Sequence, residues 1–284
     1  MKIAYVTDSG TGKSICEHAK DGIVSLPLQI SDENTTWQDM ETLSVTDMIT
    51  LLKQGHVFTT SQPAYGLVEE CFESLKEQGV DLIVAVPICN GLSGTISTFT
   101  SIAENLGMKI ICIDCYVTAV VEDYLIHRIR QAQQAGMDPL EIQVLCDKII
   151  TSTNTLIIPE TLDQLIRGGR LTPVAAKLGK LLKITPVLQI NKKTSGRIDT
   201  LDKVRTFRKE LTRAMEQMSV DHVGEEDDWS ITIAHVDNLE MAETLKQQMK
   251  ERFPKAAIDI IPLCSPVAAH TGLGSICIQY FRKF

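Results

Sequence analysis

The first half of the chain alternates continuous apolar segments with amphipathic ones, and this alternation constrains the fold more than any other feature. The longest apolar run covers residues 82–89 and is eight residues long. That length suits a strand buried on both faces of a parallel sheet, whereas a membrane-spanning helix needs about 20 apolar residues. We therefore expect a doubly wound α/β domain with a parallel sheet. Its expected strands are residues 2–7, 23–30, 81–88 and 109–113, of which the last two should be buried, and its expected helices are residues 46–54, 65–78, 95–106 and 118–135.

The second half has a different rhythm, with strand signals that follow one another more closely. Strands 185–191 and 197–204 are separated by a short Lys-Lys-Thr-Ser-Gly turn, which predicts an antiparallel hairpin. We expect a two-layer α/β domain with a mixed six-stranded sheet, and place the two domains at residues 1–152 and 153–284. The other expected strands are 155–159, 230–235, 257–262 and 275–281, and the expected helices are 140–152, 161–167, 173–182, 206–218 and 239–253.

The formal net charge of −8 conceals one strongly basic segment. Residues 167–213 hold thirteen Lys and Arg against three acids, a local charge of +10, so the rest of the chain carries −18. The overall acidity argues against binding to a nucleic-acid backbone, and an aromatic content of 5% argues against stacking on single strands. The basic segment can be the solvated face of helix 173–182, but its few acids favour a docking surface for an acidic or phosphate-bearing partner.

The amino terminus and the cysteines bear on where such a chain works. The first apolar stretch ends at Asp8 and is too short for the core of a signal peptide, so we expect a cytoplasmic protein without stable membrane insertion. Most of the eight cysteines lie in apolar runs, as reduced, buried thiols do. Cys112 and Cys115 form a lone CxxC with no second pair or histidines at ligand spacing, so neither a metal site nor a redox role is favoured.

Two short motifs suggest enzymes and leave that alternative open. Residues 9–14, Ser-Gly-Thr-Gly-Lys-Ser, are similar to the end of a phosphate-binding P-loop, but Thr7 stands where the first Gly belongs and Asp8 would repel phosphate. Residues 91–95, Gly-Leu-Ser-Gly-Thr, approach a nucleophile elbow, with Thr95 in place of the last Gly. The alternatives are a nucleotide-dependent transferase using residues 9–14 and a hydrolase or acyl-transfer enzyme using Ser93 with His270 as base.

Hydroxyl side chains precede two of the expected helices. Residues 59–63, Thr-Thr-Ser-Gln-Pro, come before helix 65–78, where Ser or Thr can simply be a helix cap. Residues 91–95 open helix 95–106, whose first N–H groups favour an anion. In a doubly wound domain both clusters would converge at the carboxyl edge of the sheet, where ligands bind.

Four separated motifs occur in a fixed order along the chain: Thr-Ser-Gln-Pro at 60–63, Gly-Leu-Ser-Gly-Thr at 91–95, Leu-Ile-Arg-Gly-Gly-Arg at 165–170 and His-Thr-Gly-Leu-Gly at 270–274. Their order and spacing resemble those of the DegV family of bacterial lipid-binding proteins, over essentially the whole chain. The resemblance implies a DegV-like fold and a carrier without a catalytic centre, cofactor or metal. It also implies one long-chain fatty acid bound between the domains and a partner, an ATP-dependent fatty acid kinase, that phosphorylates the carboxylate.

The resemblance assigns the head-group residues by motif position. It implies that Thr60 and Ser93 bind the fatty-acid carboxylate. It further implies that Ser61, Gly94 and His270 support the head-group region.

Two arginines match positively charged family positions. The resemblance implies that Arg170 and Arg205 lie near the opening and take part in kinase docking or head-group contact. The chain departs from the family pattern at Ala64 and Cys115, where Ser is usual, and at Leu273, where Pro is usual. None of these changes removes an expected carboxylate ligand, but they could alter the pocket shape and the acyl preference.

Overall fold

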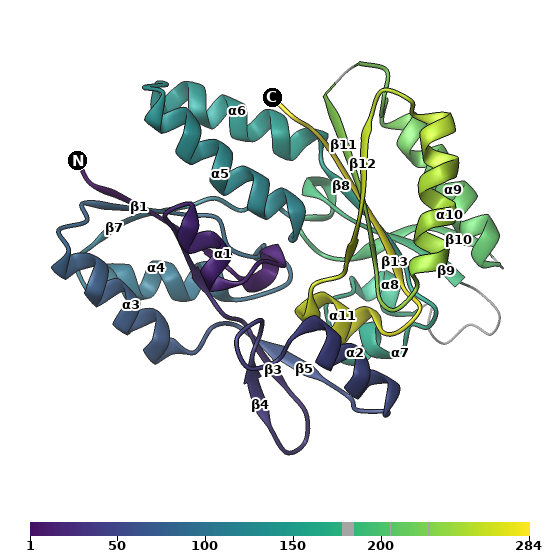
Figure 1. The fold of residues 1–284 in the computed structure, drawn as a ribbon, viewed down its shortest axis with the longest axis horizontal. Helices are drawn as coiled ribbons and strands as arrows, with labels where there is room; N and C mark the ends of the chain where they lie inside the picture. The colour runs from purple at the N-terminus through teal and green to yellow at the C-terminus, as the bar shows by residue number, and fades with distance from the viewer. Residues whose placement is uncertain (178–184, 205, 227) are drawn as a thin grey trace.

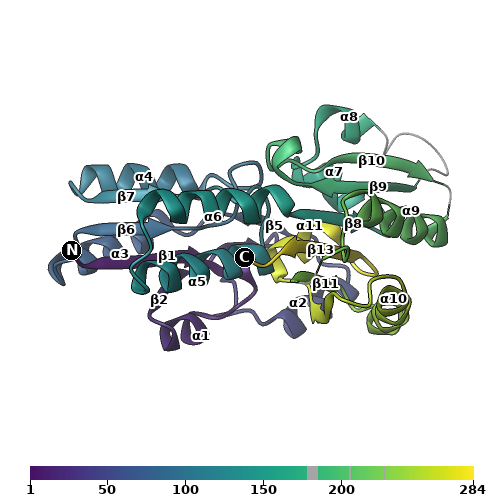
Figure 2. The ribbon, with the colours of Figure 1, turned by 90° about the horizontal axis from the view of Figure 1, so that it is seen from above.

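The computed structural model describes residues 1–177, 185–204, 206–226 and 228–284. A four-stranded sheet forms the core of the amino-terminal half (Figure 1). Its strand order is β2-β1-β6-β7, and every neighbouring pair is parallel (Figure 2). This is the doubly wound parallel sheet expected from the alternating pattern. Its strands are β1 (Ile3–Asp8), β2 (Ile23–Leu26), β6 (Leu82–Ala85) and β7 (Lys109–Cys112).

Helices cover both faces of this sheet because successive side chains of a buried strand point in opposite directions. Val6 of β1 packs in a cluster with α3 (Tyr65–Glu77) and α4 (Thr95–Asn105). Tyr5, its neighbour, packs in another cluster with α5 (Val120–Gln134) and α6 (Pro139–Ser152). The prediction of a buried strand at 109–113 is wrong in one respect. β7 is the outer strand, and the side chain of Ile111 is 52% exposed.

The carboxyl-terminal half forms the predicted mixed sheet of six strands, in the order β10-β9-β8-β13-β11-β12. Only β11 and β12 run parallel, and β9 and β10 form the expected antiparallel hairpin. The strands are β8 (Asn154–Ile158), β9 (Thr185–Ile190), β10 (Asp199–Val204), β11 (Trp229–His235), β12 (Ala257–Pro262) and β13 (Ile276–Arg282). Helices α9 (Phe207–Val220) and α10 (Leu239–Arg252) cover one face, as Figure 2 shows from above.

A third sheet, of three short antiparallel strands, was not expected. It has the order β4-β3-β5, with β3 (Gln29–Ser31), β4 (Thr36–Gln38) and β5 (Thr59–Ser61). The single strand predicted at 23–30 is therefore two strands in different sheets, separated by Pro27 and Leu28. Residues 59–61 are a strand and do not cap α3, whose N-cap residue is Ala64 and which has no side-chain cap.

The helix α11 (Ser265–Thr271) joins the two halves. It packs against α7 (Asp163–Gly168) from the carboxyl-terminal half and against β3 and β5 from the amino-terminal half (Figures 1 and 2). The other helices in the described part of the chain are α1 (Ile15–Lys20), α2 (Val45–Lys53) and α8 (Pro173–Ala176), with short 3-10 turns η1 (Ser9–Thr11) and η3 (Lys192–Thr194). Beyond residue 177, the helix predicted at 173–182 lies outside the described residues.

Two findings bear on membrane association and on disulfide formation. Among the described residues, no helix is both apolar enough and long enough to cross a bilayer. All eight cysteines are free thiols.

Candidate functional site

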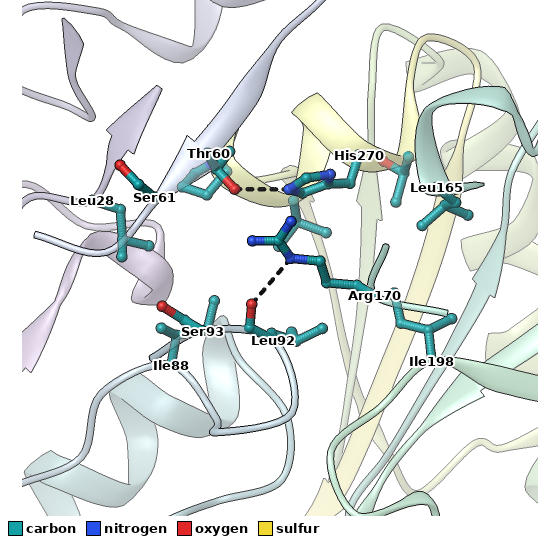
Figure 3. Close-up of a pocket in the computed structure, with 13 residues that line it drawn as sticks. Leu28, Thr60, Ser61, Ile88, Leu92, Ser93, Leu165, Arg170, Ile198 and His270 are labelled. Atoms are coloured by element: carbon teal, nitrogen blue, oxygen red, sulfur yellow. Dashed lines mark hydrogen bonds between the residues drawn. The ribbon is translucent and has the colours of Figure 1, made fainter. Parts of the chain in front are cut away.

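A cavity lies where α11, β5, the turn before α4 and the segment after α7 meet (Figure 3). It holds about 500 Å³ of non-atom space, open solvent included. Five of the seven residues that the motifs singled out line it: Thr60, Ser61, Ser93, Arg170 and His270. Segments more than 200 residues apart in the sequence therefore meet at one site.

Thr60 and His270 face each other across this cavity. Thr60 lies at the centre of β5, paired with Ile30 of β3, and His270 lies on α11. The Thr60 Oγ1 and His270 Nε2 atoms are 2.7 Å apart and form a hydrogen bond, drawn as a dashed line in Figure 3. The strand geometry fixes the Thr60 hydroxyl, and the packing of α11 on β5 brings the imidazole to it.

Ser93 reaches the same cavity from the opposite side. It belongs to the turn after β6, in which the Leu92 and Ser93 N–H groups both donate to the Cys89 carbonyl. Its hydroxyl is 2.8 Å from the Thr95 hydroxyl, at the first residue of α4. The N-cap residue, Gly94, provides no side-chain cap, so the start of α4 lends positive potential to this wall. Gly94 itself is exposed and is not among the residues that line the cavity.

The Gly-Gly-Arg motif at residues 168–170 has a separate structural reason at each position. A Cβ atom on Gly168 would lie 2.3 Å from His270 Nδ1, so only glycine lets the imidazole lie against α7. Gly169 ends α7 in the left-handed region, with φ of 68°. Arg170 then turns into the cavity, where its Nε donates to the Leu92 carbonyl at 3.2 Å and its Nη1 donates to the Gly168 carbonyl.

Arg170 supplies the positive charge of this site. Burial, followed by the nearby Arg170 charge, lowers the pKa of His270 to about 4, so the imidazole is neutral at pH 7. Among the described residues that line the cavity, Arg170 is then the one cation and no acid is present. Hydroxyl groups, a neutral imidazole and one guanidinium form a site for a single carboxylate or similar anion.

A second cavity adjoins the first, and Leu92, Ile198 and Val267 line both. Its lining is mostly aliphatic and comes from the face of the six-stranded sheet and from the start of α5. The first cavity holds the polar and cationic groups, and the adjoining one is lined mostly by aliphatic side chains. Together they suit an amphipathic ligand with a small anionic head and a hydrocarbon tail.

The loop at residues 9–14 does not form a phosphate cradle. Asp8 is fully buried beneath it and accepts hydrogen bonds from the N–H groups of Gly10 and Ile88, at 2.8 and 3.0 Å. Burial raises the pKa of Asp8 to about 6, and burial together with the Asp8 charge raises the pKa of Glu122 well above its usual range. Lys13 is 2.7 Å from the Asp123 carboxylate. A phosphate here would meet two buried carboxyl groups, and the lysine is already paired.

The metal and redox alternatives gain no support from the geometry. In the part of the chain that the structure describes, no group of three or more His, Cys, Asp or Glu side chains could hold a metal ion. Burial raises the thiol pKa of both Cys112 and Cys115, which disfavours the reactive thiolate form.

Some cations of the basic segment, residues 167–213, form ion pairs in the structure, although few acids lie near them in the sequence. Arg213 lies 2.8 Å from the Asp202 carboxylate, and Lys192 lies 3.1 Å from that of Asp147. Arg170 is half-buried in the cavity rather than free on the surface. The second predicted arginine, Arg205, lies outside the described residues.

The motifs did not indicate every residue that shapes these cavities. Gln279 lines the second cavity and is 5% exposed. Its signal was a single polar residue inside an otherwise apolar strand, β13. Gly91 opens one of the motifs, and its own role appears only in the structure. A Cβ atom there would lie 2.0 Å from the Gly196 carbonyl oxygen, so this glycine lets the two halves of the molecule touch.

Comparison with known proteins shows which protein family has this architecture. A family model described as "Uncharacterised protein, DegV family" matches residues 2–283. A DegV domain-containing protein of Halalkalibacterium halodurans is 30% identical over 283 residues, which are 99% of this chain and 98% of that protein. A fatty acid binding DegV family protein from Streptococcus agalactiae has a TM-score of 0.89 at 24% identity, and DegV, a fatty acid binding protein from Bacillus subtilis, has 0.87 at 22%. Both structural comparisons cover 100% of each chain.

Proposed function

Because this chain belongs to the DegV family, we propose that it is a fatty-acid-binding protein that holds one long-chain fatty acid in its two adjoining cavities. The observation that carries the proposal is that a cavity with hydroxyl groups, an imidazole and one guanidinium adjoins a cavity lined mostly by aliphatic side chains. The carboxylate occupies the first cavity, between Thr60, Ser93 and Arg170, and the hydrocarbon tail extends into the second. The Streptococcus agalactiae and Bacillus subtilis proteins, described as fatty acid binding, share this fold.

The tail supplies most of the affinity in this arrangement. Burying ~15 methylene groups contributes up to ~12 kcal/mol at ~0.8 kcal/mol each, before the cost of association is subtracted. Hydrogen bonds to a charged carboxylate contribute roughly 1.5–3 kcal/mol each. The head-group residues therefore set mainly the orientation of the ligand, with its carboxylate at the Arg170 end.

The proposed role is that of a cytoplasmic carrier, not an enzyme. The Ser93 hydroxyl contacts Thr95, and the His270 imidazole is bonded to Thr60 through Nε2, so the two do not form a nucleophile and base pair. We propose that a separate fatty acid kinase acts on the presented ligand. A carboxylate oxygen attacks the γ-phosphorus of ATP, the bond to the ADP oxygen breaks, and an acyl phosphate and ADP result.

Substitutions of the two hydroxyls test carboxylate binding. Thr60→Ala and Ser93→Ala should each weaken the binding of palmitic acid to delipidated protein by about 10- to 150-fold, since each removes a hydrogen bond to a charged group. Thr59→Ala on the same strand and Ser97→Ala on α4 are matched controls, because both residues are exposed and lie outside the cavity lining. Unchanged binding and unchanged kinase-dependent phosphorylation in the Thr60→Ala/Ser93→Ala double variant would refute the site.

A charge reversal tests presentation to the kinase. Arg170→Glu should reduce acyl-phosphate formation by added kinase and ATP more than it reduces fatty-acid binding, because the contribution of the buried tail is unaffected. A larger loss of binding than of phosphorylation per bound ligand would make Arg170 a pocket residue only.

A further inference from the structure

The residues that line the second cavity form regular rows across the six-stranded sheet. Cys277 of β13 pairs with Ile157 of β8 and with Ala234 of β11, and Ala234 pairs in turn with Ile261 of β12. All four line the cavity, so this row is wholly apolar apart from one thiol.

The next row on the same face is polar. Two residues further along β13, Gln279 pairs with Thr155 of β8 and with Thr232 of β11, and all three line the cavity. Side chains two residues apart share a face, and the step between them is ~6.6 Å, the length of about five methylene groups.

The polar row lies at the end of the cavity that is farther from the head group. Helix α11, which carries His270, follows the carboxyl end of β12. The row of Cys277 and Ala234 is nearer that end, because β11 runs parallel to β12 and β13 runs antiparallel. A tail that starts beside His270 therefore crosses the apolar row first and reaches Gln279 afterwards.

Gln279 also fixes the start of α5 over this row. Its Nε2 donates to the Thr118 carbonyl and to Thr155 Oγ1, both at 2.8 Å, and its Oε1 accepts from the Val121 N–H at 3.0 Å. Between Thr118 and Val121 lies Ala119, which lines the cavity with φ of 63° and ψ of −131°, a strained conformation for any residue with a side chain. The amide of Gln279 thus holds a strained turn of backbone against the sheet and caps a helix that has no cap of its own.

Beyond Gln279 the space is filled. Phe281, the next residue of β13 on this face, is 1% exposed, and its ring centroid lies 4.9 Å from that of Tyr124 on α5. Neither aromatic ring is among the residues that line the cavity. The cavity therefore ends at the row of Gln279.

We infer that the row of Thr155, Gln279 and Thr232, closed from above by the Ala119 turn, is the end wall of the acyl cavity and sets the longest acyl chain that the protein accepts. This inference rests on the proposed fatty-acid binding. A tail that is too long cannot pass this wall unless it breaks the three hydrogen bonds of Gln279 or displaces the Phe281 ring.

Two substitutions test the assignment, one in front of the wall and one in the wall itself. Ala234→Leu places three more carbon atoms in the apolar row before the wall and shortens the cavity. Gln279→Ala removes the amide and opens the wall. Ala103→Leu is the matched control, since Ala103 is equally buried but packs in the cluster between the sheet and helices α3 and α4.

Each delipidated protein is mixed with equal amounts of lauric, myristic, palmitic, stearic and arachidic acids, and the bound acids are extracted and measured by mass spectrometry. Circular dichroism and thermal denaturation confirm folding. We expect Ala234→Leu to lower the ratio of stearic to lauric acid at least about fivefold, as overpacking of a fixed cavity does. We expect Gln279→Ala to raise the bound share of arachidic acid, and Ala103→Leu to keep the wild-type ranking.

The outcomes separate this inference from the proposed function. If the wild-type protein binds none of the acids, the proposed function fails. If it binds them and folded Ala234→Leu keeps the wild-type ranking, the tail does not cross this row and the inference is overturned. A wild-type ranking in folded Gln279→Ala, or the same shift in Ala103→Leu, overturns it as well. Because Ala234→Leu leaves the Gln279 bonds in place, the test stands even if Gln279→Ala does not fold.

Discussion

Replacing Gly168 with alanine tests the packing that holds the head-group histidine. Gly168 is the last residue of α7 and does not have a positive φ, so alanine suits its backbone. Alanine is excluded because there is no room for its Cβ atom. The added Cβ would lie 2.3 Å from His270 Nδ1 and 2.8 Å from Cε1, whereas unstrained contacts need ~3.5 Å or more. The imidazole must therefore move by about 1 Å.

That movement acts on the contact between His270 and Thr60. The ring is bonded through Nε2 to the Thr60 hydroxyl at 2.7 Å, and a shift of about 1 Å takes this pair outside hydrogen-bond geometry. Because His270 then no longer holds the Thr60 hydroxyl, the contact of that hydroxyl with the carboxylate weakens. The affinity for the fatty acid should fall by up to the roughly 10- to 150-fold that one hydrogen bond to a charged group contributes. Overpacking should also lower the free energy of unfolding by about 1–3 kcal/mol.

Gly66→Ala is the control for this experiment. Gly66 lies within α3, and no atom lies within 4 Å of the place where an added Cβ would sit, so alanine should raise stability by ~0.5–1 kcal/mol and leave binding unchanged. Titration calorimetry with palmitic acid gives the affinities, and urea denaturation gives the stabilities. Wild-type affinity in a folded Gly168→Ala protein would refute the role given to the His270 contact.

Three further substitutions test other parts of the structure. Gly91→Ala places a Cβ 2.0 Å from the Gly196 carbonyl oxygen, so it should force the two halves apart, lower the melting temperature and weaken fatty-acid binding; an unchanged melting curve would argue against the close contact. Burial raises the pKa of Asp39 to about 7, so the folded state keeps a proton that the unfolded chain loses above about pH 4, and the free energy of unfolding should fall by roughly 2–4 kcal/mol between about pH 4 and pH 7. Asp39→Asn should flatten this slope in urea denaturation at several pH values, and an equal slope in both proteins would contradict the assignment. Tyr280→Phe removes a hydroxyl 2.5 Å from the Asp221 carboxylate and should cost about 1–3 kcal/mol of unfolding free energy, with little effect on binding.

The amino-terminal sheet was predictable because burial on both faces leaves a continuous apolar run, as in β6. An apolar run does not indicate the order of the strands in the sheet. For this reason β7 was expected to be buried, although it is an edge strand with Ile111 exposed. The short strands β3, β4 and β5 have three residues each and are too short to show a periodic pattern. Pro27, which cannot donate a ladder hydrogen bond, was the available sign that the strand at 23–30 breaks.

The head-group residues of the candidate site could be predicted, because each of them belongs to a sequence motif. Thr60, Ser93, Arg170 and His270 were proposed from four separated motifs, and they line one cavity. The cavity for the tail was not predictable, because its rows combine residues from four strands whose pairing is known only once the sheet is formed. The requirement for glycine at position 168 could not be predicted for the same reason. His270, which lies against Gly168 in space, is about 100 residues away in the sequence.

The most direct test of the proposed function is the identity of the molecule that occupies the two adjoining cavities. The protein is purified rapidly after expression, denatured and extracted with organic solvent, and the extract is quantified by mass spectrometry against the protein concentration. We expect a long-chain fatty acid in nearly equimolar amount, and less of it from the Thr60→Ala/Ser93→Ala double variant. An extract without fatty acid, from protein that also fails to take up palmitic acid after purification, would contradict it.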